Sequence, residues 1–357
     1  MASPALPAFA HGGEEIGHHT EWWAAWRFDW LVSGPALAVL AIYINGMRRR
    51  AGSAHAPHPA RHISFIAGLG LVWLSLQSPV DPMAERLFSV HQIQHILIRM
   101  MGPMFIALAH PEGVLLAGSP RWLRRSVIRP VATSRVMRGL GGGVSRPWAA
   151  FLIFFLSLYF WQIPAVHDAS ILNDPLHETM HVTMLLAGLI FFFTLFRRQD
   201  PPLGASRPVR ILMILGAIVS NIILGAVTTL KDQVLYPAYD IEGRLFGISA
   251  MMDESAGGFI IWMPSSMMCL IALLFVLHGW GEQENRNMAK RYREPRSNAA
   301  MADVPQTAAE LRRKTAETNR KAATALVASA CTVFVIAISV ASLIFVLHSG
   351  QAHAAMP

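Results

Sequence analysis

Long uninterrupted blocks of apolar residues are the feature that most restricts how this chain can fold. A block of roughly 18 apolar residues is long enough to cross a ~30 Å hydrocarbon layer as a helix. Because 53% of the 357 residues are hydrophobic and only 15% are charged, such blocks dominate the chain. Eight of them predict spans at 28–46, 62–78, 87–109, 148–164, 176–196, 211–230, 257–280 and 322–347. The expected fold class is therefore all-α, a polytopic bundle of transmembrane helices.

The basic residues are confined to alternate loops, and this bias predicts how the bundle is oriented. The connections 47–61, 111–147, 197–210 and 281–321 hold 25 of the 30 lysines and arginines. Loops rich in Lys and Arg stay in the cytoplasm, so both termini are expected outside. The net charge of the whole chain is +8, and the location of its basic residues in these loops indicates what they bind. Their expected partner is the membrane lipid, and no nucleic-acid partner is expected.

Four regions follow from this topology. They are an extracytoplasmic segment with histidines (1–27), a seven-helix transmembrane core (28–280), a charged cytoplasmic connection (281–321) and an appended transmembrane helix with a short outer tail (322–357). Residues 1–10 end in a small-residue pattern like a signal-peptidase site, but no charged and apolar regions precede it. A trimmed signal peptide and an ordinary tail both stay open. Cys269 and Cys331 lie in predicted spans and lack the spacing of a thiolate metal site.

Two pairs of histidines open two of the predicted spans at their outer ends. His91 and His95 belong to the third span, and His177 and His181 to the fifth. A spacing of four residues places both members of a pair on one face of a helix. Ionisable groups within a membrane are costly and mark functional sites, so two pairs at one depth predict a shared metal site. Separation of the pairs beyond about 10 Å would exclude a mononuclear site, since metal–imidazole bonds are ~2 Å long.

Other polar residues on the outer side are candidates for further ligands or for partners of the histidines. They are His167, Asp168, Asp253, Gln94, Met184, Met252 and Asp81. Carboxylates commonly orient metal-bound imidazoles, or one of them would neutralise Arg99 within the third span. Imidazole suits zinc, copper and iron, whereas thioether favours Cu(I). Histidines near methionines, without thiolates, therefore favour copper, as Cu(I), over zinc.

The string from His177 to His181 also matches H-E-x-x-H, the signature of zinc metalloproteases. A protease needs a third ligand, a coordination position for water and, here, Glu178 as its base. That interpretation leaves the pair at His91 and His95 unexplained. A second alternative is an electron-transfer protein in which one haem is held by a histidine from each span.

Four segments, in order from about residue 22 to 280, carry motifs of a known family. They are WRFDWLVSGPALAVLAIYINGMRRR, SPVDPMAERLFSVHQIQHILIRMMGPM, FWQIPAVHDASILNDPLHETMHVTMLLAGLIFFF and DESAGGFIIWMP. The most specific element is H-x-x-Q-H, here His91, Gln94 and His95, together with the downstream histidine pair. On these residues the chain resembles the CtaG-type cytochrome c oxidase assembly factors, a family of polytopic bacterial membrane proteins.

The resemblance implies a copper-handling assembly factor rather than an enzyme. The family is associated with building haem–copper oxidases by delivering or inserting copper from the outer side. The implied partners are the copper-containing catalytic or electron-entry subunit of such an oxidase and an extracytoplasmic copper donor. The implied location is the bacterial cytoplasmic (inner) membrane, with the metal site facing the periplasm or the cell exterior.

The family pattern carries over residue by residue, with three departures. It covers His91, Gln94, His95, His177, His181 and Asp253. Where relatives have Trp-His, Tyr-Asp and Asp-Gln, this chain has Trp161-Gln162, His167-Asp168 and Asp253-Glu254. The eighth predicted span also lies beyond the usual seven. These differences leave the complete ligand set open.

Overall fold

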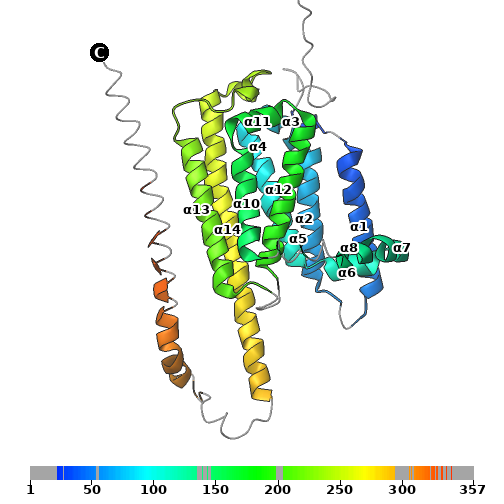
Figure 1. Ribbon diagram of the computed structural model, residues 1–357, viewed down its shortest axis with the longest axis vertical. Coiled ribbons are helices and arrows are strands. Elements are labelled where there is room, and N and C mark those ends of the chain that lie inside the picture. Colours follow the sequence, from blue (N-terminus) through cyan, green and yellow to red (C-terminus); the bar gives the residue numbers. More distant parts are fainter. Residues whose placement is uncertain are drawn as a thin grey trace, which may run out of the picture. The chain divides into compact units, whose positions relative to one another are not determined.

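The computed structural model describes residues 22–26, 28–53, 56–134, 139, 143, 146–197 and 204–293, with scattered positions from 305 to 339. Throughout these residues the regular structure is helical, and none of them lies in a strand (Figure 1). The all-α fold class is therefore confirmed. The chain divides into two compact units, 1–272 and 273–357. The division falls within the longest helix, and the histidines of the predicted metal site all belong to the first unit.

Five helices are long and apolar enough to cross a membrane. They are α1 (Trp30–Arg50), α2 (Pro59–Gln77), α12 (Asp174–Leu195), α13 (Arg207–Thr229) and the part Ala250–Asn285 of α14 (Ala250–Arg293). These helices match the first, second, fifth, sixth and seventh predicted spans.

The third and fourth predicted spans belong to bent pairs of helices. The third consists of α4 (Phe88–Ile96), a π-helical turn η2 (Leu97–Met101) and α5 (Gly102–Ala109), followed by a 73° bend into α6 (Glu112–Gly118). The fourth is α10 (Pro147–Trp161), which bends by 73° into α11 (Pro164–Ile171). Pro111 and Pro164 stand at the bends, where a residue without an N–H interrupts the helical hydrogen bonds. Counting each pair as one span gives seven.

The two ends of the chain are described only in part. Apart from 22–26, the N-terminal segment 1–27 lies outside the described residues, and so does most of the eighth predicted span, 322–347. Within the charged connection, residues 309–321 are helical.

Short helices form the connections at both ends of the first unit. They are η1 (Trp22–Ala24), α3 (Val80–Ala84), α7 (Arg121–Leu123), η3 (Arg124–Ile128), α8 (Arg129–Thr133), η4 (Pro237–Asp240) and η5 (Leu245–Gly247). In Figure 1, α6, α7 and α8 lie at the lower end of the bundle, while α3, α11 and the loop 230–249 lie at the upper end. We call the upper end the α11 end.

Two glycines permit the central helices to approach closely. α12 packs against η2 and α5, and a Cβ atom at Gly188 of α12 would overlap the backbone of Arg99. A Cβ atom at Gly257 of α14 would overlap the ring of Phe88, the first residue of α4. Glycine is the residue that allows such backbone approaches. The third, fifth and seventh spans are thereby brought together.

An apolar core surrounds this meeting point at the α11 end. Its buried residues are Phe88, Leu158, Trp161, Ile171, Met180, Met184, Tyr236, Ala238, Tyr239 and Ile261. The rings of Phe88 and Tyr236 stack with their centroids 4.4 Å apart, so the loop 230–249 packs directly onto the start of α4. A polar side chain in this region is therefore removed from solvent.

Candidate metal centre

α4 carries His91 and His95, and its N-terminus is fixed by a carboxylate from another helix. Asp253, in the first turn of α14, accepts hydrogen bonds from the backbone N–H groups of Phe88 (2.8 Å) and Ser89 (3.0 Å). It also accepts one from the Ser89 hydroxyl (2.6 Å). The first N–H groups of a helix have no partner within it, and a negative charge is favourable there. Asp253 thus sets where α4 begins, and with it the place of His91.

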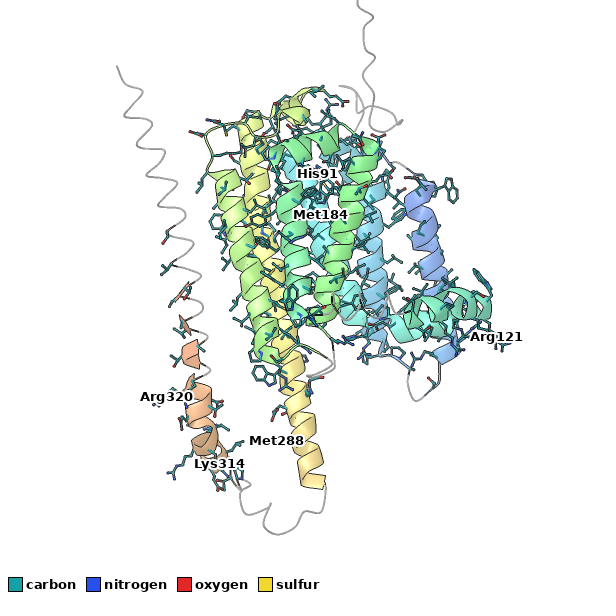
Figure 2. The ribbon with its side chains drawn as sticks, in the orientation of Figure 1. His91, Arg121, Met184, Met288, Lys314 and Arg320 are labelled. Atoms are coloured by element: carbon teal, nitrogen blue, oxygen red, sulfur yellow. The ribbon has the colours of Figure 1, made fainter. Side chains whose placement is uncertain are left out.

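α12 carries His177 and His181 and begins at a cap of its own. The side chain of Asn173 accepts a hydrogen bond from the N–H of Leu176 at 3.0 Å. Pro175 occupies the first turn, where its missing N–H costs nothing. The helix therefore starts just before His177. Both histidine pairs lie near the N-terminal starts of helices that begin at the α11 end (Figures 1 and 2).

The four predicted ligands and His167 form one buried group, which we call the histidine cluster (His91, His95, His167, His177 and His181). The ring centroid of His91 lies 5.1 Å from that of His177 and 5.9 Å from that of His181. His95 and His181 are also 5.9 Å apart, and His91 and His167 are 5.1 Å apart. All five residues are at most 8% exposed. The separation between the two pairs is well below the 10 Å limit for a shared site.

Three members of the cluster present nitrogen atoms to one another. One ring nitrogen from each of His91, His95 and His181 lies within 4.8 Å of the other two. Three nitrogens bound at ~2 Å to one ion would be about 3.5 Å apart, so small side-chain rotations would bring these atoms into coordination range. Nε2 of His91 and both ring nitrogens of His95 have no hydrogen-bond partner among the described residues. A buried polar atom without a partner is costly, and lone pairs that face one another suit a metal ion.

His91 and His167 are joined by Tyr239, which belongs to the loop between α13 and α14. The hydroxyl of Tyr239 lies 2.6 Å from Nδ1 of His91 and 2.8 Å from Nε2 of His167. Nδ1 of His167 lies 2.9 Å from the carbonyl oxygen of Trp161, the last residue of α10. Burial, and secondly the charge of Asp253, raise the pKa of Tyr239 well above its ordinary value. The hydroxyl therefore keeps its proton.

A set of paired charges holds the loop 230–249 against the helices. We call this set the loop network, and it consists of Lys231, Asp240, Arg244, Asp253 and Glu254. Arg244 contacts Asp240 at 2.8 Å, Asp253 at 2.6 Å and Glu254 at 3.2 Å. Lys231 also pairs with Glu254. The side chains of Asp253 and Glu254 are fully buried. Each buried carboxylate thus has a cationic partner in the loop network.

Two further candidates attach the neighbouring elements to this end of the bundle. Gln94 donates hydrogen bonds to the carbonyl oxygen of Ser75 (2.9 Å) and to Asp81 (2.7 Å), so it ties α4 to α2 and α3. Asp168 lies near the backbone of Ala238, so α11 and the loop meet at this position. Both side chains therefore contact the surrounding framework.

The two methionine candidates occupy different environments. Met184 is fully buried in the apolar core of the α11 end, and Figure 2 shows it close to the level of His91. Met252 is 68% exposed, whereas the histidines are buried. The structure therefore brings His167 to the four predicted ligands and leaves Met252 at the surface.

Arg99 lies one turn beyond His95 and is held by an aromatic ring and a carbonyl group. Its guanidinium packs 3.6 Å from the ring centroid of Phe154 and donates to the Phe154 carbonyl oxygen at 2.7 Å. Cation–π contacts stabilise a desolvated charge. Among the described residues, no carboxylate forms an ion pair with Arg99; Asp253 pairs with Arg244 instead. A cavity of about 10 Å³, lined by residues that include Gln92, His95 and Arg99, has room for about one water molecule.

Sequence reasoning missed the loop residues Lys231, Tyr236, Tyr239 and Arg244. A signal for them was present, because basic residues are depleted from the predicted outer side. Lys231 and Arg244 are two of only four on that side, so each is expected to have a specific acidic partner. Two of the five tyrosines of the chain stand together in the same loop, in the string YPAY.

Comparisons with known proteins agree with the motifs. The family model described as cytochrome c oxidase caa3 assembly factor (Caa3_CtaG) matches residues 40–283. Curated relatives include the uncharacterized proteins Mb0105 of Mycobacterium bovis and MT0111 of Mycobacterium tuberculosis, each 25% identical over 291 residues. The uncharacterized protein ML1998 of Mycobacterium leprae is 22% identical over 291 residues. The matches cover 77–78% of this chain but only 42–43% of these relatives, so the chain spans less than half of their length. No solved structure matches the chain.

Proposed function

Because the chain belongs to the cytochrome c oxidase caa3 assembly factor family, we propose that it binds copper at the histidine cluster and passes it to a haem–copper oxidase during assembly. The observation that carries the proposal is the convergence of ring nitrogens from His91, His95 and His181 within 4.8 Å in a buried site. His177, whose ring centroid is 4.5 Å from that of His181, is the fourth ligand candidate. The receiving partner is the copper-containing catalytic or electron-entry subunit.

The charges around the cluster favour a monovalent ion, Cu(I). Neutral imidazoles supply the ligands, and the buried carboxylates Asp253 and Glu254 are already paired with Arg244 and Lys231. Arg99 adds a positive charge one helical turn from His95. At a separation of ~6 Å and an effective dielectric constant of ~20, the repulsion between Arg99 and a bound ion is about 3 kcal/mol for each unit of charge on the ion. The repulsion doubles for Cu(II) or Zn(II), so the site is better suited to Cu(I).

The distribution of basic residues supports an orientation with the cluster on the extracytoplasmic side. Arg121 lies at the end of the bundle opposite His91 in Figure 2. The basic residues of α1 occupy its last turn, and α13 begins with Arg207 and Arg210; both helix ends point away from the α11 end in Figure 1. Under the positive-inside rule, the α11 end faces the periplasm or the cell exterior of a bacterial inner membrane. An extracytoplasmic copper donor then loads the site from that side.

The two alternative functions fit the geometry less well. A haem requires a slot the size of its macrocycle, and ligand pockets of that class are about 300–1,000 Å³. The cavity beside His95 and Arg99 is about 10 Å³. A metalloprotease requires Glu178 near the metal, but the Glu178 side chain is exposed while His177 and His181 are buried. A non-catalytic role in assembly is therefore the function we propose.

The test is the copper content of the purified protein loaded with Cu(I) under anaerobic conditions. One Cu(I) per chain is expected for the wild type and none for the variant with all four predicted ligands replaced by alanine. His62→Ala is the control, because His62 bonds to Tyr43 at 2.9 Å, outside the cluster. In cells, the fourfold variant is expected to leave the oxidase deficient in copper. Unchanged copper content in both the fourfold variant and the oxidase would refute the proposal.

A further inference from the structure

The hydrogen bonds around Tyr239 have a direction that follows from what each atom can donate. A carbonyl oxygen only accepts, so Nδ1 of His167 carries the proton that it donates to Trp161 at 2.9 Å. His167 is fully buried, and burial favours the neutral imidazole. Its Nε2 therefore has a lone pair. That nitrogen accepts the proton of the Tyr239 hydroxyl at 2.8 Å.

The same reasoning fixes the state of His91. The Tyr239 hydroxyl has a single proton, which it donates to Nε2 of His167. Its oxygen therefore accepts a hydrogen bond from His91. Nδ1 of His91, 2.6 Å away, must then carry the proton. A neutral imidazole has one proton, and Nε2 of His91 is left with a lone pair. This is the atom that has no partner among the described residues.

We propose that Tyr239 and His167 form an ordered relay that holds His91 in its Nδ1–H tautomer and so directs Nε2 toward the metal. The inference rests on the copper site proposed above and assigns positioning roles to two residues. The state of a ligating imidazole is set by the hydrogen bond that its other nitrogen makes. Both ring nitrogens of His167 are engaged, so His167 is not itself a ligand.

The relay makes the loop 230–249 part of the metal site. Tyr239 reaches His91 only when this loop is seated, and Arg244 holds the loop by donating to the carbonyl oxygen of Tyr236 at 3.1 Å. Asp253 pairs with Arg244 and also fixes the start of α4. One carboxylate therefore determines both where His91 lies and whether Tyr239 can orient it.

The first test compares Cu(I) affinity in two tyrosine variants. Tyr239→Phe removes the hydroxyl of the relay, and loss of such an outer partner typically weakens metal binding 10–100-fold. The matched control is Tyr236→Phe, because both tyrosines are 1% exposed. The hydroxyl of Tyr236 bonds to Gln162 at 2.9 and 3.1 Å and to no histidine among the described residues. The control is expected to keep the affinity of the wild type. Equal affinity of the two variants would overturn the relay.

The second test measures the tautomer directly and needs no copper. In ¹⁵N NMR of the metal-free, histidine-labelled protein, His91 is expected to be protonated on Nδ1, and Tyr239→Phe is expected to give a mixture of tautomers. A purely structural role of Tyr239 would not change this signature. A wild-type His91 protonated on Nε2 would refute the relay even if Tyr239→Phe fails to fold. If the wild type instead binds no Cu(I), the proposed function fails while the tautomer result still stands.

Discussion

Two sets of polar side chains share the α11 end of the bundle, and they differ in whether their buried polar atoms have hydrogen-bond or ionic partners. In the loop network, Asp253 and Glu254 each have a cationic partner and backbone N–H donors. In the histidine cluster, Nε2 of His91 and both ring nitrogens of His95 have no hydrogen-bond partner among the described residues. The first set is complete within the protein, whereas the second offers lone pairs to something else.

The difference separates residues that build the site from residues that act in it. An unsatisfied buried polar group lowers the free energy of unfolding by about 1–3 kcal/mol. A cluster of such groups therefore requires that the surrounding structure be stable enough to offset this loss. The loop network supplies part of that framework, because Asp253 links α14, α4 and the loop. The two sets should therefore respond in opposite ways when a member is removed.

The largest effect is expected from Asp253→Asn in the metal-free protein. The substitution removes a buried charge that pairs with Arg244 and caps α4. Breaking one partner of a buried ion pair costs about 3–5 kcal/mol. A fall of that size in the free energy of unfolding is expected when the variant is denatured in detergent.

The matched control for this prediction is Asp240→Asn. Asp240 pairs with the same arginine, but its side chain is 47% exposed, and such pairs contribute at most about 1 kcal/mol. Equally small losses in the two variants would show that the loop network does not support the fold. The contrast with the histidine cluster would then disappear.

A smaller effect, of opposite sign, is expected from His95→Leu. The side chain is 3% exposed, and replacing its unpartnered nitrogens by apolar atoms should stabilise the metal-free protein by about 1 kcal/mol. Cu(I) binding should weaken in the same variant. The control is His62→Leu, which breaks the 2.9 Å bond to Tyr43 and should lower stability without changing Cu(I) affinity. A destabilised His95→Leu variant would mean that the wild-type cluster is satisfied after all.

The sequence predicted the parts of this molecule that depend on local pattern. The apolar runs located five spans as single helices and two as parts of bent pairs, and Pro111 and Pro164 account for the bends. The spacing of His91 and His95, and of His177 and His181, placed each pair on one helix face. Their common depth followed because both helices start from the same side.

The contacts between distant segments could not be predicted in the same way. Asp253 was a candidate partner for a histidine, but it caps α4 and pairs with Arg244, and this choice depends on how α14 packs on Phe88. His167 was a possible ligand, and only its distances to Tyr239 and Trp161 reveal that both its nitrogens are engaged. Assigning the partners of Asp253 and His167 requires the position of the loop 230–249, and the periodicity of a sequence does not predict the conformation of a loop.

The smallest effect is expected from Glu178→Gln, which tests the H-E-x-x-H match directly. Adjacent residues on a helix point about 100° apart, and here that rotation leaves Glu178 exposed while His177 is buried. Stability should change by less than about 0.5 kcal/mol, as for most surface substitutions, and Cu(I) affinity should match that of the wild type. Cu(I) titration and detergent unfolding check both values. Metal-dependent cleavage of a peptide bond that is lost in this variant would contradict the proposal, because Glu178 would then act as a base at the cluster. The exposed position of Glu178 argues against that outcome, since a base must reach a water molecule on the metal.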